Sequence, residues 1–269
     1  MHTLNADNYV GTTALLNDQL FVSHNSAQRV SVCNTTSFQL QRQLIIPGLG
    51  SRVSGPAACA TNNVLYVSDY FNQVIHKVDL FITSGDSVVS RWGVASGPYG
   101  LSVNRAHNVI VALFRKVQEY TPSGSLVREI HDSNNYLWQA IELNSVMLAV
   151  IRRHPAHGVA MMSMDGRVIR SLGNEAGSGV GQMNNPCGIA VDNDGYIFVA
   201  DNTNNRILVV NPSLTDSRQL PLPVNTSLNR PRAVSLDQSR GRLYVGEDHD
   251  QQRVLIFDNV INIRAMFIT

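Results

Sequence analysis

The sequence predicts an all-β protein built from six copies of one four-stranded unit. Three observations predict this fold class. Long amphipathic helical patterns are missing, and short runs rich in β-branched and aromatic residues alternate with Gly, Pro, Asn and Asp. One segment, IFVAD at 197–201, recurs in related forms with an average spacing of about 45 residues. A second segment, GIAVD at 188–192, has counterparts ahead of most copies.

The last residue of the recurring segment marks one key position in each copy. In chain order, the six copies hold His24, Asp69, Leu113, Ile151, Asp201 and Glu247 there. Each copy contains strands a, b and c and a looser strand d, which in the fifth copy are GIAVD, YIFVA, RILVV and SRQLPLP. Four strands in a repeat of about 40–50 residues predict one blade of a β-propeller, and six blades close into a ring.

The repeats also set the expected boundaries. We expect a single propeller over residues 1–269, with blades at about 10–46, 55–92, 97–131, 136–173, 185–222 and 230–268. Either the C-terminal NVINIRAMFIT or the N-terminal HTLN could supply the outer strand of the sixth blade. One blade cannot bury both of its faces alone, so its apolar strands must pack against the neighbouring blades.

The repeated pattern P-x-G-[IV]-A-V-D…[IV]-[FY]-V-[AS]-D…N-x-R-[IV] resembles the NHL repeat, and the resemblance covers nearly the whole chain. It is strongest in blades five and two and weakest in blade four. No Trp-Asp dipeptide occurs, which counts against WD40 repeats. The family includes the C-terminal domain of tripartite-motif NHL proteins and RNA-binding regulators of development, and it resembles some six-bladed propeller enzymes. Any ubiquitin-ligase activity would need other regions, because no RING or B-box cysteine pattern is present.

The resemblance also implies two structural clamps. In the family, an acid at the end of strand b pairs with an arginine at the start of strand c and closes the loop between them. The matching positions here are Asp201 with Arg206 and Glu247 with Arg253. We therefore expect both pairs to stabilise loops and not to act in catalysis.

A candidate binding surface lies on one rim of the ring. In propellers the b–c and d–a loops share a rim, and here that rim has more basic residues than the opposite one. Leu113 and Ile151 replace the clamp acid in blades three and four, so we expect the nearby cations to be unpaired. Arginines bind carboxylates or phosphates, and aromatic rings offer faces for bases or apolar side chains. The predicted partner-binding residues are Phe114, Arg115, Lys116, Tyr136, Trp138, Arg152, Arg153 and His154. The alternative is a solvated basic loop with Trp138 in the core.

Metal and covalent chemistry have little support in the sequence. The starts of strand a, such as AAC at 57–59 and CGI at 187–189, carry no acids that could hold a cation in the central channel. His154 and His157 lack a third ligand, and neither C-x-x-C nor G-x-S-x-G occurs. We therefore expect no metal, no cofactor and no catalytic residues. A metal-dependent propeller hydrolase or lyase is the less favoured alternative.

Charge and composition guide the prediction of partners. A net charge of +1 is low for a dedicated nucleic-acid binder, so we expect a protein partner first and single-stranded RNA second, with no DNA. No run of about 18 apolar residues occurs, so no membrane span is expected. The absence of a secretory pattern in MHTLNADNYV and the three cysteines favour a monomeric cytoplasmic domain. Sequons at Asn34 and Asn225 favour the alternative of an extracellular adhesion module.

Overall fold

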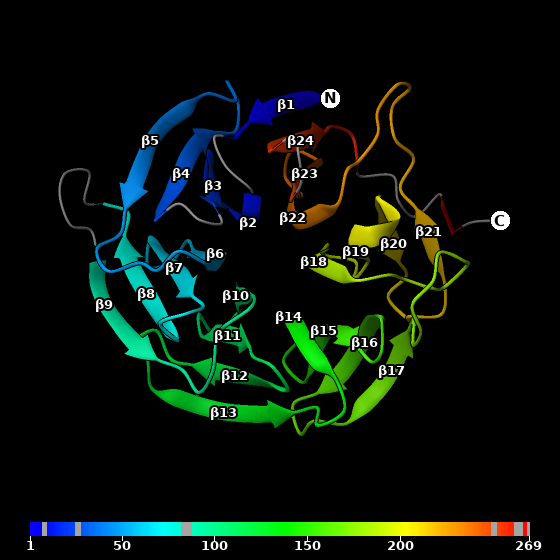
Figure 1. Cartoon of the computed structure of the whole chain (residues 1–269), viewed down its shortest axis with the longest axis horizontal. Coiled ribbons are helices and arrows are strands. Elements are labelled where there is room, and N and C mark those ends of the chain that lie inside the picture. The colour runs from blue at the N-terminus through cyan, green and yellow to red at the C-terminus, as the bar shows by residue number, and fades with distance from the viewer. Residues whose placement is uncertain (7–9, 25–27, 82–87, 249–251, 261–265, 268–269) are drawn as a thin grey trace.

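Six four-stranded antiparallel sheets form a closed ring in this computed structural model (Figure 1). The structure describes residues 1–6, 10–24, 28–81, 88–248, 252–260 and 266–267. Each sheet runs outward from the channel in the order a, b, c and d. The fold is the six-bladed β-propeller that the sequence predicts.

The first three blades follow one another along the chain with the same strand order. Blade one contains β2 (Val10–Leu16), β3 (Gln19–His24), β4 (Arg29–Asn34) and β5 (Leu40–Ile45). Blade two contains β6 (Val53–Cys59), β7 (Val64–Asp69), β8 (Val74–Asp79) and β9 (Val88–Gly93). Blade three contains β10 (Leu101–Val103), β11 (Val109–Ala112), β12 (Lys116–Tyr120) and β13 (Leu126–His131).

The last three blades complete the ring. Blade four contains β14 (Tyr136–Asn144), β15 (Met147–His154), β16 (Gly158–Ser163) and β17 (Val168–Leu172). Blade five contains β18 (Pro186–Val191), β19 (Ile197–Asp201), the short helix η1 (Asn202–Asn204), β20 (Arg206–Val210) and β21 (Ser217–Gln219). Blade six contains β22 (Pro231–Asp237), β23 (Arg242–Glu247), β24 (Arg253–Phe257) and β1 (His2–Asn5).

The N-terminal strand β1 closes the ring. It pairs antiparallel with β24, with His2 opposite Ile256 and Asn5 opposite Arg253. Of the two candidates for this strand, the N-terminal HTLN is therefore the one used; most of NVINIRAMFIT lies outside the described residues. Because β1 covers the edge of β24, blade six has the same four strands as the other blades.

The core lies between the blades. Six clusters of buried apolar side chains occur among the described residues, and each cluster combines side chains from two neighbouring blades. Strand b is buried along its whole length in β7 and β19, whereas strand d is mostly exposed in β13. Burial therefore decreases from the inner strands to the outer strand of a blade. This explains why the sequences of strands a and b are almost continuously apolar and that of strand d is not. At about 25 cal/mol per Å² of apolar surface, the contacts between blades are the main favourable term in folding.

Helices contribute almost nothing to this fold. Among the elements labelled in the described residues, η1 is the one helix, and it has three residues. No helix in the described part of the chain is long and apolar enough to cross a membrane.

Candidate functional site

The end of strand b and the start of strand a lie side by side on one face of the ring. Asp201 is opposite Pro186 in blade five, and Asp69 is opposite Val53 in blade two. The b–c loops and the d–a linkers therefore share one rim, which we call the b–c rim. All of the predicted site residues belong to strand ends and loops of this rim.

The clamp of blade five is fully formed. The carboxylate of Asp201, which is 0% exposed, accepts hydrogen bonds from the Asn184 backbone N at 2.7 Å and from Arg206 Nε at 2.7 Å. Arg206 also donates to the backbone oxygens of Ser178 at 3.0 Å and Gln182 at 2.9 Å. One ion pair thus joins strand b, strand c and the preceding d–a linker.

Blade six has the same arrangement with a longer acid. Glu247 is buried and accepts from Arg253 Nε at 2.6 Å and from the Asn229 backbone N at 2.7 Å. Arg253 also donates to the Ser227 oxygen at 3.1 Å. Both arginines are held by groups of their own blade, so these contacts stabilise the loops.

Blade two uses a histidine in place of the arginine. Asp69 accepts from the Gly50 backbone N at 2.7 Å and from Asn72 Nδ2 at 2.8 Å, and its Oδ2 lies 3.5 Å from His76 Nε2. Burial lowers the pKa of His76 below its ordinary value, partly opposed by the hydrogen bond with Asp69.

Arg152 is not unpaired, and this expectation was wrong. Its Nε lies 3.1 Å from Oδ2 of Asp132, a buried acid in the linker between blades three and four. Asp132 also accepts from Asn135 Nδ2 at 2.9 and 3.0 Å, and Asn135 Oδ1 accepts from the Ala156 backbone N at 3.3 Å. The clamp of blade four therefore keeps its charge pair, although Ile151 replaces the acid at the end of strand b.

Lys116 is also paired, contrary to expectation. Its Nζ donates to Glu129 Oε2 at 2.8 Å, and Gln118 Nε2 donates to the same oxygen at 2.6 Å. The hydrogen bond from Lys116 is the largest cause that lowers the pKa of Glu129. This ammonium group belongs to the outer strands of blade three and is not left for a ligand.

Four of the predicted residues form an exposed stack, which we call the outer cluster. The rings of Phe114 and Tyr136 are 4.1 Å apart between centroids, and those of Tyr136 and His154 are 5.2 Å apart. The guanidinium carbon of Arg115 lies 5.4 Å from the Phe114 centroid and 5.6 Å from the Tyr136 centroid. Phe114 is 40% exposed, and the structure gives Arg115 no carboxylate partner among the described residues.

A second group of aromatic residues lies at the mouth of the central channel. Trp138 packs on Tyr99 at 4.6 Å, and Tyr99 on Tyr70 at 5.2 Å, with the two tyrosine hydroxyl oxygens 3.3 Å apart. Phe71 extends this row from Tyr70 at 5.4 Å and is 61% exposed. The row joins blades two, three and four. Trp138 is therefore half-buried beneath the rim, and it also packs against the apolar cluster between blades four and five.

Three arginines surround this row, and together with it they form what we call the mouth cluster. Arg52 lies 4.0 Å over the Tyr70 ring, Arg153 3.7 Å over the Trp138 ring, and Arg232 5.4 Å from the same ring. Arg232 Nη1 also pairs with Asp248 at 2.6 Å. Six of the eight predicted site residues thus divide between two clusters, with Arg153 and Trp138 at the mouth and the other four in the outer cluster, while Arg152 and Lys116 belong to neither.

Arg153 has an unusual environment for a cation. Its Nε donates to Asn185 Oδ1 at 2.6 Å and its Nη2 donates to the same oxygen, which is neutral. Burial lowers the pKa of Arg153 below its ordinary value, and the neighbouring Arg232 lowers it further. The structure shows no carboxylate within ion-pair distance of Arg153 in the described part of the chain.

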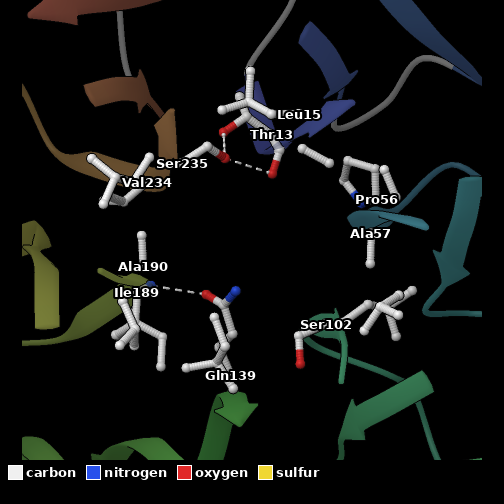
Figure 2. A pocket seen from close by; sticks show the side chains of 17 residues that line it. Thr13, Leu15, Pro56, Ala57, Ser102, Gln139, Ile189, Ala190, Val234 and Ser235 are labelled. Carbon is white, nitrogen blue, oxygen red and sulfur yellow. Dashed lines mark hydrogen bonds between the residues drawn. The ribbon is translucent and has the colours of Figure 1, made fainter. Parts of the chain in front are cut away.

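The channel below the mouth is uncharged and lined mainly by aliphatic side chains, with a few polar groups. It encloses about 240 Å³ and is lined by the innermost strands of all six blades (Figure 2). Gln139 Oε1 accepts from the Ile189 backbone N at 3.0 Å, and the hydroxyls of Thr13 and Ser235 hydrogen-bond at 2.8 Å. Figure 2 shows Gln139 extending into the channel from the strand that also carries Trp138. Within the described residues, no group of three or more His, Cys, Asp or Glu could hold a metal ion.

The architecture defines a six-bladed repeat propeller, and comparison with known families makes this more specific. Residues 183–210, which include β18, β19 and β20, match the family model of the NHL repeat. The chain is therefore a six-bladed β-propeller whose fifth blade contains an NHL repeat. This matched stretch contains the Asp201–Arg206 clamp, in agreement with the strength of the repeat pattern in blade five.

Solved structures share the fold at low sequence identity. Hydrazine synthase from Kuenenia stuttgartiensis matches with a TM-score of 0.71 and 15% identity, over 98% of this chain and 81% of that one. The WD40 propeller domain of Doa1 matches at 0.69 and 14%, over 96% and 95%. A streptogramin B lyase matches at 0.67 and 12%, over 96% and 86%. No curated protein matches the chain in sequence.

Blade two contributes Tyr70 and Arg52 to the site, which was not predicted from the sequence. Tyr70 directly follows the clamp acid Asp69, so its repeat position places it at the b–c rim. That signal could have found it. No sequence signal links Tyr70 and Arg52 to Trp138, because the ring brings these blades together.

Proposed function

We propose that this protein is a non-catalytic recognition propeller that binds a protein partner through its b–c rim. The outer cluster carries the proposal, because it presents an exposed phenylalanine, a tyrosine and an arginine without a carboxylate partner on one surface. Aromatic residues and arginine are the residue types that dominate the binding energy of protein interfaces. The mouth cluster continues the same kind of surface toward the channel.

The contacts on the rim favour a protein over RNA. Arg152, Arg206, Arg232, Arg253 and Lys116 all have carboxylate partners, so few charges remain to follow a phosphate backbone. The aromatic faces are also largely covered. Tyr136 lies between Phe114 and His154, and Trp138 lies between Tyr99 and Arg153. A nucleobase would need an open ring face on which to stack.

Single-stranded RNA is the second candidate. Arg52, Arg115 and Arg230 lie on the same rim without a carboxylate partner in the described residues, and Arg115 and Arg230 are exposed. Phosphate contacts from these three would give binding that weakens steeply with salt.

The channel supports a role without catalysis. Its lining offers aliphatic side chains, two serines, a threonine and a glutamine, and none of these is a strong ligand for a hard cation or a general base at neutral pH. The enzymes among the similar structures share the fold at 12–15% identity, and function belongs to sites and not to folds. Cys33, Cys59 and Cys187 are buried and form no disulfide within the described residues, which supports a reducing, cytoplasmic setting.

Site-specific photo-crosslinking tests this proposal. A photoreactive phenylalanine analogue is placed at Phe114 on the b–c rim, and in a matched variant at Phe81, which is 77% exposed and follows strand c of blade two on the opposite rim. Both proteins are irradiated in lysate of the source organism, and the adducts are identified by mass spectrometry. We expect one discrete protein adduct with the analogue at 114 and none with the analogue at 81.

The double variant Phe114→Ser/Arg115→Ser provides the second arm. In competition, the unlabelled wild-type protein should suppress the adduct and the unlabelled double variant should not. Equal adducts from both positions would contradict the proposal. So would loss of the adduct after ribonuclease treatment, which would instead favour the RNA candidate.

A further inference from the structure

We propose that the mouth cluster is a carboxylate-binding site, in which Arg52 and Arg153 hold an acidic side chain or the C-terminal carboxylate of the protein partner. This inference rests on the proposed function, because it names the chemistry of the partner segment that enters the channel mouth. The outer cluster would supply the surrounding contact area.

Among the described residues, the positive charges at the mouth outnumber the negative ones. Three guanidinium groups, from Arg52, Arg153 and Arg232, share the mouth with the carboxylate of Asp248, which pairs with Arg232 at 2.6 Å. No carboxylate partner of Arg52 or Arg153 occurs in the part of the chain that the structure describes. A cation held away from bulk water without an anion costs free energy, and a bound anion relieves this cost.

The donors of Arg153 point to the kind of anion. Its Nε and Nη2 both donate to Asn185 Oδ1, whereas the structure shows no acceptor for Nη1 among the described residues. The guanidinium is therefore anchored along one edge, and its other edge keeps donors for a ligand. Arginine presents donors in a planar fork that matches the two oxygens of a carboxylate.

The tyrosines add a neutral donor beside the arginines. The Tyr70 and Tyr99 hydroxyls are 3.3 Å apart, so one of them donates to the other and the second proton remains for a ligand. Burial raises the pKa of Tyr99 to about 12, which keeps its hydroxyl protonated at physiological pH. Arg52 lies 4.0 Å over the Tyr70 ring and 6.0 Å from the Tyr99 ring centroid, so its charge lies beside both tyrosines.

The position of Trp138 beneath the site is fixed by close packing. Trp138 is held between Tyr99 and Arg153, and the chain at Gly100 passes so close that an added Cβ would lie 2.7 Å from the Trp138 carbonyl oxygen. Any larger residue at 100 would therefore push blades three and four apart. A preorganised set of donors gains binding free energy because little ordering is needed when the ligand arrives.

The surroundings favour a carboxylate over a nucleotide. The Trp138 ring is already contacted by Tyr99 and Arg153, which leaves less of this ring for a stacked base. Asp248 adds a negative charge at the same place, which opposes a phosphate more strongly than a singly charged carboxylate. The uncharged channel below can receive the end of an extended side chain, with Gln139 reaching into it (Figure 2).

Three fluorescein-labelled peptides of equal length test the inference by fluorescence polarisation. The first has an internal Glu-Glu-Asp and an amidated C-terminus, the second has Gln-Gln-Asn and an amidated C-terminus, and the third has Gln-Gln-Asn and a free carboxylate. We expect the first or the third to bind at least about tenfold more tightly than the second. The first reports a side-chain carboxylate and the third a terminal one.

Arginine substitutions locate the site. Arg52→Gln and Arg153→Gln should each weaken the preferred peptide by about tenfold or more, while Arg167→Gln, a 76% exposed residue on the opposite rim, should leave it unchanged. Removal of Arg153 could disturb the packing of Trp138, whereas Arg52 does not contact that ring. Arg52→Gln therefore tests the site independently. Thermal unfolding of each variant verifies that it is folded.

Tryptophan fluorescence gives an independent readout. The chain has two tryptophans, so Trp138 is the sole one in a Trp92→Phe background. A carboxylate bound to Arg153 should change the Trp138 emission, because that guanidinium lies 3.7 Å over the ring. The titration should saturate at the affinity given by polarisation.

Two results would overturn the inference. Either equal binding of all three peptides or unchanged binding by both arginine variants would show that the mouth does not select a carboxylate. If the adduct at position 114 still forms with Arg52→Gln/Arg153→Gln, the proposed function stands and the carboxylate site fails. If neither adduct nor peptide binding occurs, the proposed function itself fails.

Discussion

Blades five and four close the same loop with their charges in opposite places. In blade five the acid, Asp201, lies at the end of strand b, and its arginine starts strand c. In blade four the arginine, Arg152, lies near the end of strand b, and its acid, Asp132, comes from the preceding linker. Both acids are buried and both arginines are 14% exposed. In both blades a buried acid and an arginine therefore fix the end of strand b, with the sign of the strand-b residue reversed.

This difference changes what the rim presents. In blade five, Arg206 is fully occupied by Asp201 and two linker carbonyls. In blade four, Arg152 closes the loop, and the next residue, Arg153, lies over Trp138 at the channel mouth. Strands β14 and β15 also have nine and eight residues, against six and five in β18 and β19. The blade that matches the repeat pattern most weakly is thus the one whose clamp uses a different acid, from the preceding linker.

Removal of the two acids should give the largest effect. Asp201→Ala leaves Arg206 without its anion and three donors without an acceptor, so we expect a loss of about 3–5 kcal/mol in the free energy of unfolding. Asp132→Ala should cost about 2–3 kcal/mol, because its closest contact with Arg152 is longer, at 3.1 Å. Chemical denaturation measures both. Glu175→Ala, an exposed acid in the linker before blade five, is the control, and an equal loss there would contradict the clamp.

The arginines of the two blades should differ in the same assay. Arg206→Gln removes a group with one carboxylate and two carbonyl partners and should cost about 2–3 kcal/mol. Arg153→Gln removes a cation without a carboxylate partner and should cost less than about 1 kcal/mol. If Arg153→Gln proved as costly as Arg206→Gln, Arg153 would be a structural residue and not a binding residue.

The b–c loop of blade four, which contains His157, should also respond to mild acid. Burial lowers the pKa of His157 below its ordinary value, followed by the charges of His154 and Arg153, and neutral His157 Nδ1 accepts from the Asn185 backbone N at 2.9 Å. The unfolded chain binds a proton near pH 6.5 while the folded chain does not, so stability is present above about pH 6.5 and is lost as pH falls toward the folded pKa.

His157→Asn should therefore flatten the fall in unfolding free energy between about pH 6.5 and pH 5. Burial lowers the pKa of His76 in blade two as well, so His76→Asn should remove a separate part of the same slope. Blade five has no histidine in its clamp. A wild-type slope that persists in the double variant would show that other groups cause it.

The smallest effect is expected at Lys116. Its ion pair with Glu129 is about one quarter exposed on both sides, and pairs of this kind contribute about 0–1 kcal/mol. Lys116→Gln should therefore change neither stability by more than about 0.5 kcal/mol nor the crosslink at position 114. A lost crosslink would place Lys116 back in the binding surface.

The fold could be predicted because the signal is local and repeated. Strands such as VLYVSD at 64–69 and IFVAD at 197–201 are apolar throughout since both faces are buried, and turn residues separate them. The closing strand could not be chosen, because segments at both ends of the chain contain β-forming residues. The pairing of β1 with β24 joins the two ends of the chain, and no local sequence pattern indicates such a long-range contact.

The site could be predicted only in part. The exposed stack of Phe114 and Tyr136 follows from adjacent rim loops of neighbouring blades. The partners of Arg152 and Lys116 could not be predicted from the sequence. Asp132 lies in the linker before blade four and not at the usual position of the acid, and Glu129 lies on the neighbouring strand d. The mouth cluster depends on ring geometry, which brings Arg52 and Arg232 near Trp138 across the channel opening.

The pairing of β1 with β24 has a consequence for synthesis on the ribosome. Residues 2–5 leave the ribosome about 250 residues before their partners at 253–256. At about 5–20 residues per second, β1 waits roughly 10 to 50 seconds for its neighbour. The nascent chain is an open arc during that time, and Arg232 joins the mouth only when blade six is in place. A partner that binds at the mouth therefore selects finished molecules over chains still being translated.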